Sequence, residues 1–133
     1  LILLTNDGEL AFRMTHPRFA VSKIYWTLLD HAPTPAALQH LKSGVKLSEG
    51  WAKPIRTQRV PHVEAPTDGQ WWEMVISEGR KHQVKRMWQR TGYEVQRLIR
   101  VAFGPLRLGD LGAGKWREVT SEELKSLKSA VGL

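Results

Sequence analysis

The sequence predicts an α+β fold in which a mixed, mostly antiparallel sheet is flanked by helices. Segments with the two-residue alternation of strands and segments with the 3.6-residue period of helices both occur along the chain. They follow one another without the regular strand–helix–strand spacing that builds a parallel sheet. The length of 133 residues fits one domain or part of one. A chain of this size buries roughly two thirds of its unfolded surface, so a core is feasible.

The first third of the chain reads as strand, helix, strand. Residues 1–5 are apolar and predict a short strand, and the Asn-Asp-Gly sequence of residues 6–8 predicts a turn. Residues 9–14 predict a short helix that ends at His16-Pro17, because proline disfavours the helical conformation of the residue before it. Residues 21–29 are rich in apolar and aromatic side chains and predict a strand.

The middle of the chain opens with a helix. Thr34 is placed to cap it, Pro35 suits its first position, and Gly44 ends it. Residues 45–47 predict a short strand, and residues 53–63 predict a longer strand of mixed pattern.

After a turn at residues 65–69, a strand is expected at residues 71–76. Its two faces carry Trp71, Glu73 and Val75 on one side and Trp72, Met74 and Ile76 on the other. Adjacent residues point to opposite faces, so Trp71-Trp72 indicates sheet packing rather than a platform for a nucleobase.

The last third predicts one more central helix and the closing strands. The helix covers about residues 82–90 and ends at Gly92. Strands are expected at residues 95–103, 106–108 and 116–119. Thr120 or Ser121 then caps a final helix, whose first turn is acidic and whose later positions are basic, as the helix dipole favours.

Composition narrows the classes of function. The formal net charge is +7, which favours a polyanionic partner, either nucleic acid or an anionic membrane, over a charge that serves solubility alone. The absence of cysteine excludes disulfides, thiolate metal sites and cysteine nucleophiles, and suits a cytoplasmic protein. No apolar run approaches the roughly 20 residues of a membrane span. The five histidines show no paired metal-ligand spacing, so no metal site is expected.

The basic residues gather on the helix at residues 82–90. On a helical projection its apolar side holds Val84, Met87, Trp88 and Thr91, and its other side holds His82, Lys85, Arg86, Gln89 and Arg90. No acidic residue occurs between Gly79 and Tyr93, and Arg97, Arg100 and Arg107 follow. This stripe is typical of a nucleic-acid binder. A solvated helix face is the plainer alternative, and a membrane helix is disfavoured because the apolar stripe is narrow and short.

Three stretches resemble the RsuA-type branch of the ribosomal-RNA pseudouridine synthases. They are residues 1–10 with Thr15-His16-Pro17-Arg18, then Lys23-Ile24-Tyr25, and then residues 78–87 continuing through residues 97–101 and 104–111. The tail Gly114-Lys115-Trp116-Arg117 also fits. The match runs along nearly the whole chain, which then corresponds to the C-terminal part of the catalytic domain.

The resemblance implies isomerisation of uridine to pseudouridine without a cofactor, on a nucleotide flipped into a pocket. The substrate implied is ribosomal RNA, and the tail after Gly104 is more similar to the large-subunit members. In this family the catalytic Asp lies in a Gly-Arg-Leu-Asp motif just before the stretch that matches Leu1, so the chain is expected to be a fragment that is inactive alone. Sheet edges exposed by such a truncation would favour oligomers.

The resemblance also implies roles for individual residues. Tyr25 matches the active-site tyrosine that stacks on the flipped base, although from the residues alone it reads as a half-buried strand tyrosine. Lys85 matches the basic residue that pairs with the catalytic carboxylate, so the two side chains are expected to share a cavity. Val84 matches an apolar pocket position. Candidate phosphate contacts are Arg80, His82, Arg86, Arg90, Arg97 and Arg100.

Two other functions stay open on the sequence. A non-catalytic RNA-binding or ribosome-associated module needs only the basic charge and no Asp. DNA binding is weaker, because no helix-turn-helix or zinc pattern occurs.

Overall fold

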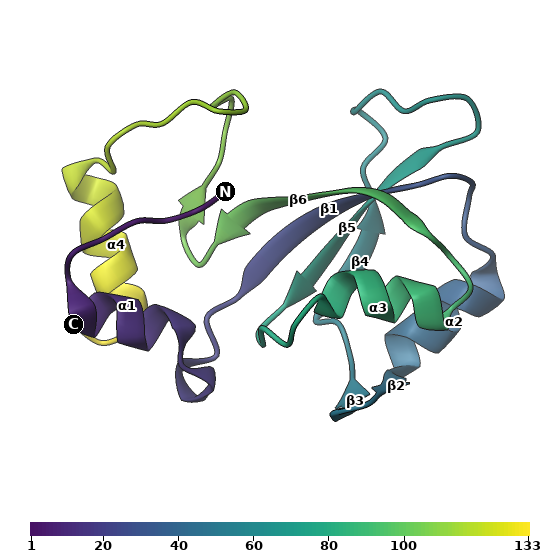
Figure 1. Ribbon diagram of the computed structural model, residues 1–133, viewed down its shortest axis with the longest axis horizontal. Coiled ribbons are helices and arrows are strands. Elements are labelled where there is room, and N and C mark those ends of the chain that lie inside the picture. The colour runs from purple at the N-terminus through teal and green to yellow at the C-terminus, as the bar shows by residue number, and fades with distance from the viewer.

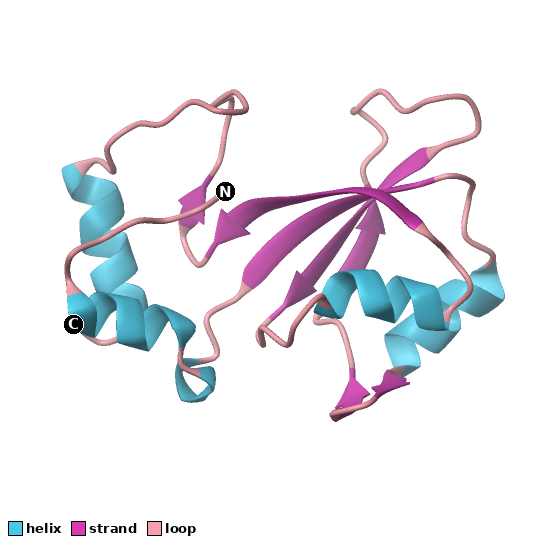
Figure 2. Ribbon diagram, viewed as in Figure 1, coloured by secondary structure: helices cyan, strands magenta, loops and turns pink.

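The structure is a computed structural model that describes residues 1–133 and shows a five-stranded antiparallel sheet in the order β4-β5-β1-β6-β7 (Figures 1 and 2). A separate hairpin pairs β2 with β3. In chain order the elements are α1 (Gly8–Thr15), the 3-10 helix η1 (Pro17–Phe19), β1 (Lys23–Leu29), α2 (Pro35–Ser43), β2 (Val45–Leu47), β3 (Gly50–Ala52), β4 (Arg56–Arg59), β5 (Gln70–Ile76), α3 (Gln83–Arg90), β6 (Val95–Phe103), β7 (Leu106–Arg107) and α4 (Ser121–Ala130). The predicted α+β class is confirmed.

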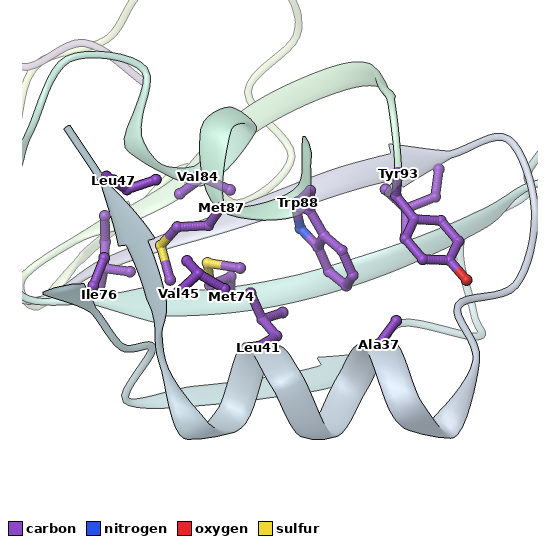
Figure 3. Close-up of a cluster of buried hydrophobic side chains, with 12 residues drawn as sticks. Ala37, Leu41, Val45, Leu47, Met74, Ile76, Val84, Met87, Trp88 and Tyr93 are labelled. Carbon is purple, nitrogen blue, oxygen red and sulfur yellow. The ribbon is translucent and has the colours of Figure 1, made fainter. Parts of the chain in front are cut away.

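The main core lies between one face of the sheet and the helices α2 and α3 (Figure 3). Met74 and Ile76 of β5 point into it, whereas Trp71 of the same strand belongs to a smaller cluster with Leu28 and Val60. The side chains of β5 therefore alternate between the two faces of the sheet as the sequence predicted. The two adjacent tryptophans pack on opposite faces. From α3, the core receives Val84, Met87 and Trp88, which are at most 3% exposed.

A second apolar cluster joins α1 and α4 at the β7 end of the sheet (Figure 1). Leu10 and Met14 of α1 pack there with Leu127 of α4. Arg13 reinforces this contact, since its Nη1 atom donates to the carbonyl oxygens of Val131 and Gly132 at 2.9 and 3.2 Å. The strands β1 and β6 run between this cluster and the main core (Figure 1).

The helix starts follow their capping residues. Asp7 accepts a hydrogen bond from the Leu10 backbone N–H, so the predicted turn at residues 6–8 is also the N-cap of α1. Thr34 caps α2 as predicted. Thr120, not Ser121, caps α4, and it forms a reciprocal capping box with Glu123. No helix is long and apolar enough to cross a lipid bilayer.

Two predicted strands are wrong. Residues 1–5 and 116–119 have no backbone partner and form no strand. Apolar sequence alone is insufficient, because a strand needs a neighbouring backbone to pair with. Leu1 and Leu3 pack against the second cluster, while Ile2 and Leu4 are 80% and 86% exposed.

The strand predicted at residues 53–63 is shorter than expected. Only Arg56–Arg59 forms β4, and the missed strand β3 precedes it. The Val60 N–H still bonds to the Trp71 carbonyl, but the chain enters a turn at Pro61-His62 and leaves the sheet there. The result is an edge strand of four residues beside β5.

Candidate active site

A cavity of about 270 Å³ opens where the ends of β1, β5 and β6 meet the segment that leads into α3. Its walls combine basic, aromatic and apolar side chains, and no carboxylate lines it. The lining residues are Thr15, Lys23, Tyr25, Ile76, Gly79, Arg80, His82, Gln83, Val84, Arg100 and Phe103. The cavity is therefore suited to a flat, negatively charged ligand.

The strand register explains why Lys23 and Tyr25 share this cavity. They lie two residues apart on β1, so their side chains project from the same face of the sheet. Tyr25 is opposite Met74 on β5 and opposite Arg100 on β6. Tyr25 and Arg100 are thus neighbours across the two strands, and both line the cavity.

An irregularity in β6 brings Arg100 and Phe103 to the same cavity. Ile24 pairs with Ala102 but Tyr25 pairs with Arg100, so Val101 is an extra residue in the ladder. Residues three apart on a regular strand point to opposite faces, and a bulge of one residue reverses this. The Arg100 guanidinium consequently lies over the Phe103 ring, 4.5 Å from its centroid.

Gln83 holds the cavity wall formed by residues 78–84. Its side chain is buried, accepts a hydrogen bond from the Arg80 N–H at 3.1 Å and donates to Glu78 Oε1 at 2.9 Å. Arg80 is further fixed by an ion pair with Glu78 at 3.0 Å and by a bond to the Trp51 carbonyl at 2.9 Å. His82 precedes α3 in the left-handed conformation, with φ at 51°. The segment is thus shaped before the helix begins.

Lys23 is an unusual member of this wall because it is a lysine with only 8% exposure. Its ammonium group donates to the Val21 carbonyl at 3.1 Å and lies 5.6 Å from the centroid of the Phe103 ring. Burial, and then the nearby positive charge of Arg100, lower the pKa of Lys23 below its ordinary value, while Glu78 acts in the opposite direction. The surroundings of Lys23 therefore do not fully balance its charge.

The structure brings five of the nine predicted site residues to this cavity, namely Tyr25, Arg80, His82, Val84 and Arg100. Lys85 is exposed and is not among the lining residues, contrary to the expected cavity shared with Tyr25. The reason is the helical period: α3 buries Val84 and Trp88, and the side chain about 100° from Val84 is turned towards solvent.

The other three predicted RNA contacts lie elsewhere. Arg86 is engaged by Glu49 through two hydrogen bonds of 2.7 Å, and these bonds lower the pKa of Glu49 to about 2. Arg90 is exposed at the end of α3. Arg97 lies 5.7 Å from the centroid of the Trp71 ring, in the cluster on the other face of the sheet. These arginines do not converge with the cavity.

The sequence interpretation gave no role to several lining residues, including Lys23, Gln83 and Phe103. The two-residue strand period could have found Lys23, because it places that residue on the same face as Tyr25. No local pattern could have found Phe103, since its position depends on the bulge at Val101.

The chain is similar to known proteins along its whole length. A family model described as RNA pseudouridylate synthase matches residues 1–90. An uncharacterized RNA pseudouridine synthase of Aquifex aeolicus is 44% identical over 133 residues, which cover 100% of this chain and 52% of that protein. Ribosomal large subunit pseudouridine synthase B of Pseudomonas aeruginosa is 37% identical over 134 residues, covering 100% of this chain and 34% of the relative.

Comparison with solved structures also finds a pseudouridylate synthase. A crystal structure of a pseudouridylate synthase superposes with a TM-score of 0.75 at 29% identity, covering 92% of this chain and 52% of the other. Ribosomal large subunit pseudouridine synthase E of Vibrio parahaemolyticus is 35% identical over 133 residues, covering 90% of this chain and 55% of that protein. The chain spans about half the length, or less, of these relatives. Since the family model matches well over half of it, the chain belongs to the RNA pseudouridylate synthase family.

Proposed function

We propose that these 133 residues are the C-terminal part of the catalytic domain of an enzyme that isomerises a specific uridine of large-subunit ribosomal RNA to pseudouridine. The observation that carries the proposal is Tyr25, whose ring faces a cavity lined by Lys23, Arg80 and Arg100. An aromatic ring can stack on a base taken out of its helix, and the cations can hold its phosphates. The names of relatives B and E support the large-subunit substrate, which implies a cytoplasmic enzyme.

The reaction conserves every atom of the uridine. The bond between N1 and C1′ breaks, the base turns, a bond forms between C5 and C1′, the C5 proton leaves, and N1 gains a proton. No oxidant or cofactor is required. In the proposed site the ring of Tyr25 holds the base during this turn, and its phenol oxygen assists removal of the C5 proton. Val84 provides an apolar wall.

The nucleophilic carboxylate is assigned to a Gly-Arg-Leu-Asp motif preceding the stretch that matches Leu1. That motif does not occur among the 133 residues, and no carboxylate lines the cavity. We propose that Lys85 pairs with this carboxylate and keeps it ionised. Lys85 is exposed on α3 and does not line the cavity. The carboxylate would therefore meet Lys85 on the solvent side of this helix. The isolated chain is then expected to be inactive.

The test compares the isolated chain with a protein that also carries the upstream motif. Ribosomal RNA containing uridine tritiated at C5 releases tritium when the base is isomerised. Release is expected only from the longer protein, and it should fall at least 100-fold in a Tyr25→Phe, Lys85→Ala double variant, the usual contribution of a positioned proton-transfer group. Lys125→Ala on α4 is the charge control. Absence of pseudouridine from the longer protein, or full activity of the double variant, contradicts the proposal.

A non-catalytic RNA-binding or ribosome-associated module is the second candidate, and the exposed basic side of α3 favours it. Arg80, His82, Arg86, Arg90, Arg97 and Arg100 are the proposed RNA contacts in either case. Both functions predict that log K falls by about 0.7–0.9 per phosphate contact for each decade of salt. RNA binding that persists with no tritium release from the longer protein would favour this second function.

A further inference from the structure

We propose that Lys23 and Arg100 together form a binding site for one anionic oxygen group in the cavity. The inference rests on the proposed function, and it assigns Lys23 a role that the sequence interpretation did not give it. We assign this group to a phosphate of the bound RNA, because the cavity also contains Tyr25, the residue proposed to hold the base, and no carboxylate lines it. A carboxylate from residues upstream of Leu1 is the competing ligand that the experiment has to exclude.

The geometry concentrates positive charge at this point. Lys23 and Tyr25 reach it from one face of β1, and the bulge at Val101 turns Arg100 towards it from β6. Phe103 lies against both cations, 5.6 Å from the Lys23 ammonium and 4.5 Å from the Arg100 guanidinium, measured to the ring centroid. An aromatic face stabilises a cation but leaves its N–H groups free for a further acceptor.

The surrounding groups leave this charge without an anionic partner. The Lys23 ammonium has three N–H donors, of which one is used by the Val21 carbonyl, and no carboxylate is bonded to it. Glu78 is the acid that acts on Lys23, but its two oxygens are taken by Arg80 and Gln83. None of the other nine lining residues is acidic: they are Thr15, Tyr25, Ile76, Gly79, Arg80, His82, Gln83, Val84 and Phe103.

Glycine at position 79 keeps the approach to Lys23 open. A Cβ atom there would lie 3.9 Å from both Cε and Nζ of Lys23. A side chain at this position would therefore begin in van der Waals contact with the end of Lys23. With glycine, an oxygen atom can reach Lys23 along the cavity wall.

Arg100 also links the site to the start of the chain. Its Nε and Nη2 atoms donate to the Leu1 carbonyl at 3.1 and 2.8 Å. The Leu1 backbone therefore lies beside the proposed site. For this reason the experiment also has to test a carboxylate of the longer protein as the competing ligand.

The experiment uses the protein that carries the upstream motif and compares Lys23→Met with Lys125→Met. Methionine keeps the buried stem of Lys23 and removes only the charge. RNA affinity is measured across a range of salt concentrations, and the single-turnover rate of tritium release is measured across pH. Arg100→Met is the second variant, and Lys23→Arg tests whether restoring the charge restores the wild-type values.

A phosphate and a carboxylate give distinct results, and the carboxylate result would overturn the assignment to an RNA phosphate. For a phosphate, Lys23→Met weakens RNA binding about tenfold and reduces the salt slope by about 0.7–0.9, with an unchanged pH profile. For a carboxylate, RNA affinity stays within about twofold, and the acidic limb of the rate moves up by about one pH unit, because the carboxylate pKa rises without its cation.

The inference is overturned if Lys23→Met and Arg100→Met fold as the wild type does and change neither RNA affinity, salt slope nor pH profile. Failure of the proposed function looks different. The unaltered longer protein would then release no tritium, and the salt slopes of RNA binding would still decide whether Lys23 contacts a phosphate.

Discussion

Replacing Gln83 by Met should destabilise the protein by about 2 kcal/mol, because this side chain anchors the wall of the cavity. The Gln83 amide donates to the charged Glu78 at 2.9 Å and accepts from the Arg80 N–H at 3.1 Å. A hydrogen bond to a charged group contributes about 1.5–3 kcal/mol, and an N–H left without a partner costs about 1–3 kcal/mol where it is fully buried. Here it is only partly buried, and the apolar methionine side chain offsets some of the loss.

The assay is equilibrium unfolding in urea. With a slope of about 2 kcal/mol per molar urea for a protein of this size, the midpoint should fall by about 1 M. Gln89→Met is the matched control, because Gln89 is exposed on the same helix. Equal midpoints for the two variants would refute the claim that Gln83 fixes this segment.

Three further predictions concern stability. Trp88→Ala should cost about 3–5 kcal/mol in urea unfolding, because Trp88 is 0% exposed within the main core. Thr120→Ala should cost about 1 kcal/mol by the same measurement, since it removes the capping box with Glu123. Hydrogen bonds from Arg86 lower the pKa of Glu49 from 4.5 to about 2, so this ion pair stabilises the fold fully above pH 4.5 and its contribution is lost as pH falls towards 2. Glu49→Gln should remove that pH dependence, and an unchanged acid unfolding profile would contradict the assignment.

Local patterns predicted most of the elements because each had a physical boundary in the sequence. The strand at Val95–Phe103 and the helix between Thr34 and Gly44 have the predicted bounds. Thr34 and Gly44 determine the helix ends through their own hydrogen bonding and conformation, so no distant contact is needed. The errors at residues 1–5 and 116–119 have the opposite cause: whether an apolar segment becomes a strand depends on a partner that its own sequence does not specify.

In the cavity, too, some features follow from the local sequence and others depend on distant parts of the chain. Helical periodicity correctly predicted that Val84 and Trp88 are buried on α3. The same periodicity also turns Lys85 outwards, so a role for Lys85 depends on a carboxylate that approaches from outside the cavity wall. Sequence resemblance matches positions by their order in the chain. This order does not show that the cavity encloses Lys23 and leaves Lys85 exposed.

The enclosure of Lys23 is a property of the tertiary structure. It results from a bulge in β6, a glycine before α3 and an aromatic ring from the end of β6, and these lie 56 to 80 residues from Lys23 in the chain. A buried cation with no bonded carboxylate weakens a fold, because the charge loses its hydration without gaining a partner. Hydrophobic side chains of similar volume would fill the same space without this cost. The arrangement is explained more simply if an anion occupies the site during function, since that anion would then provide the missing partner for Lys23 and Arg100.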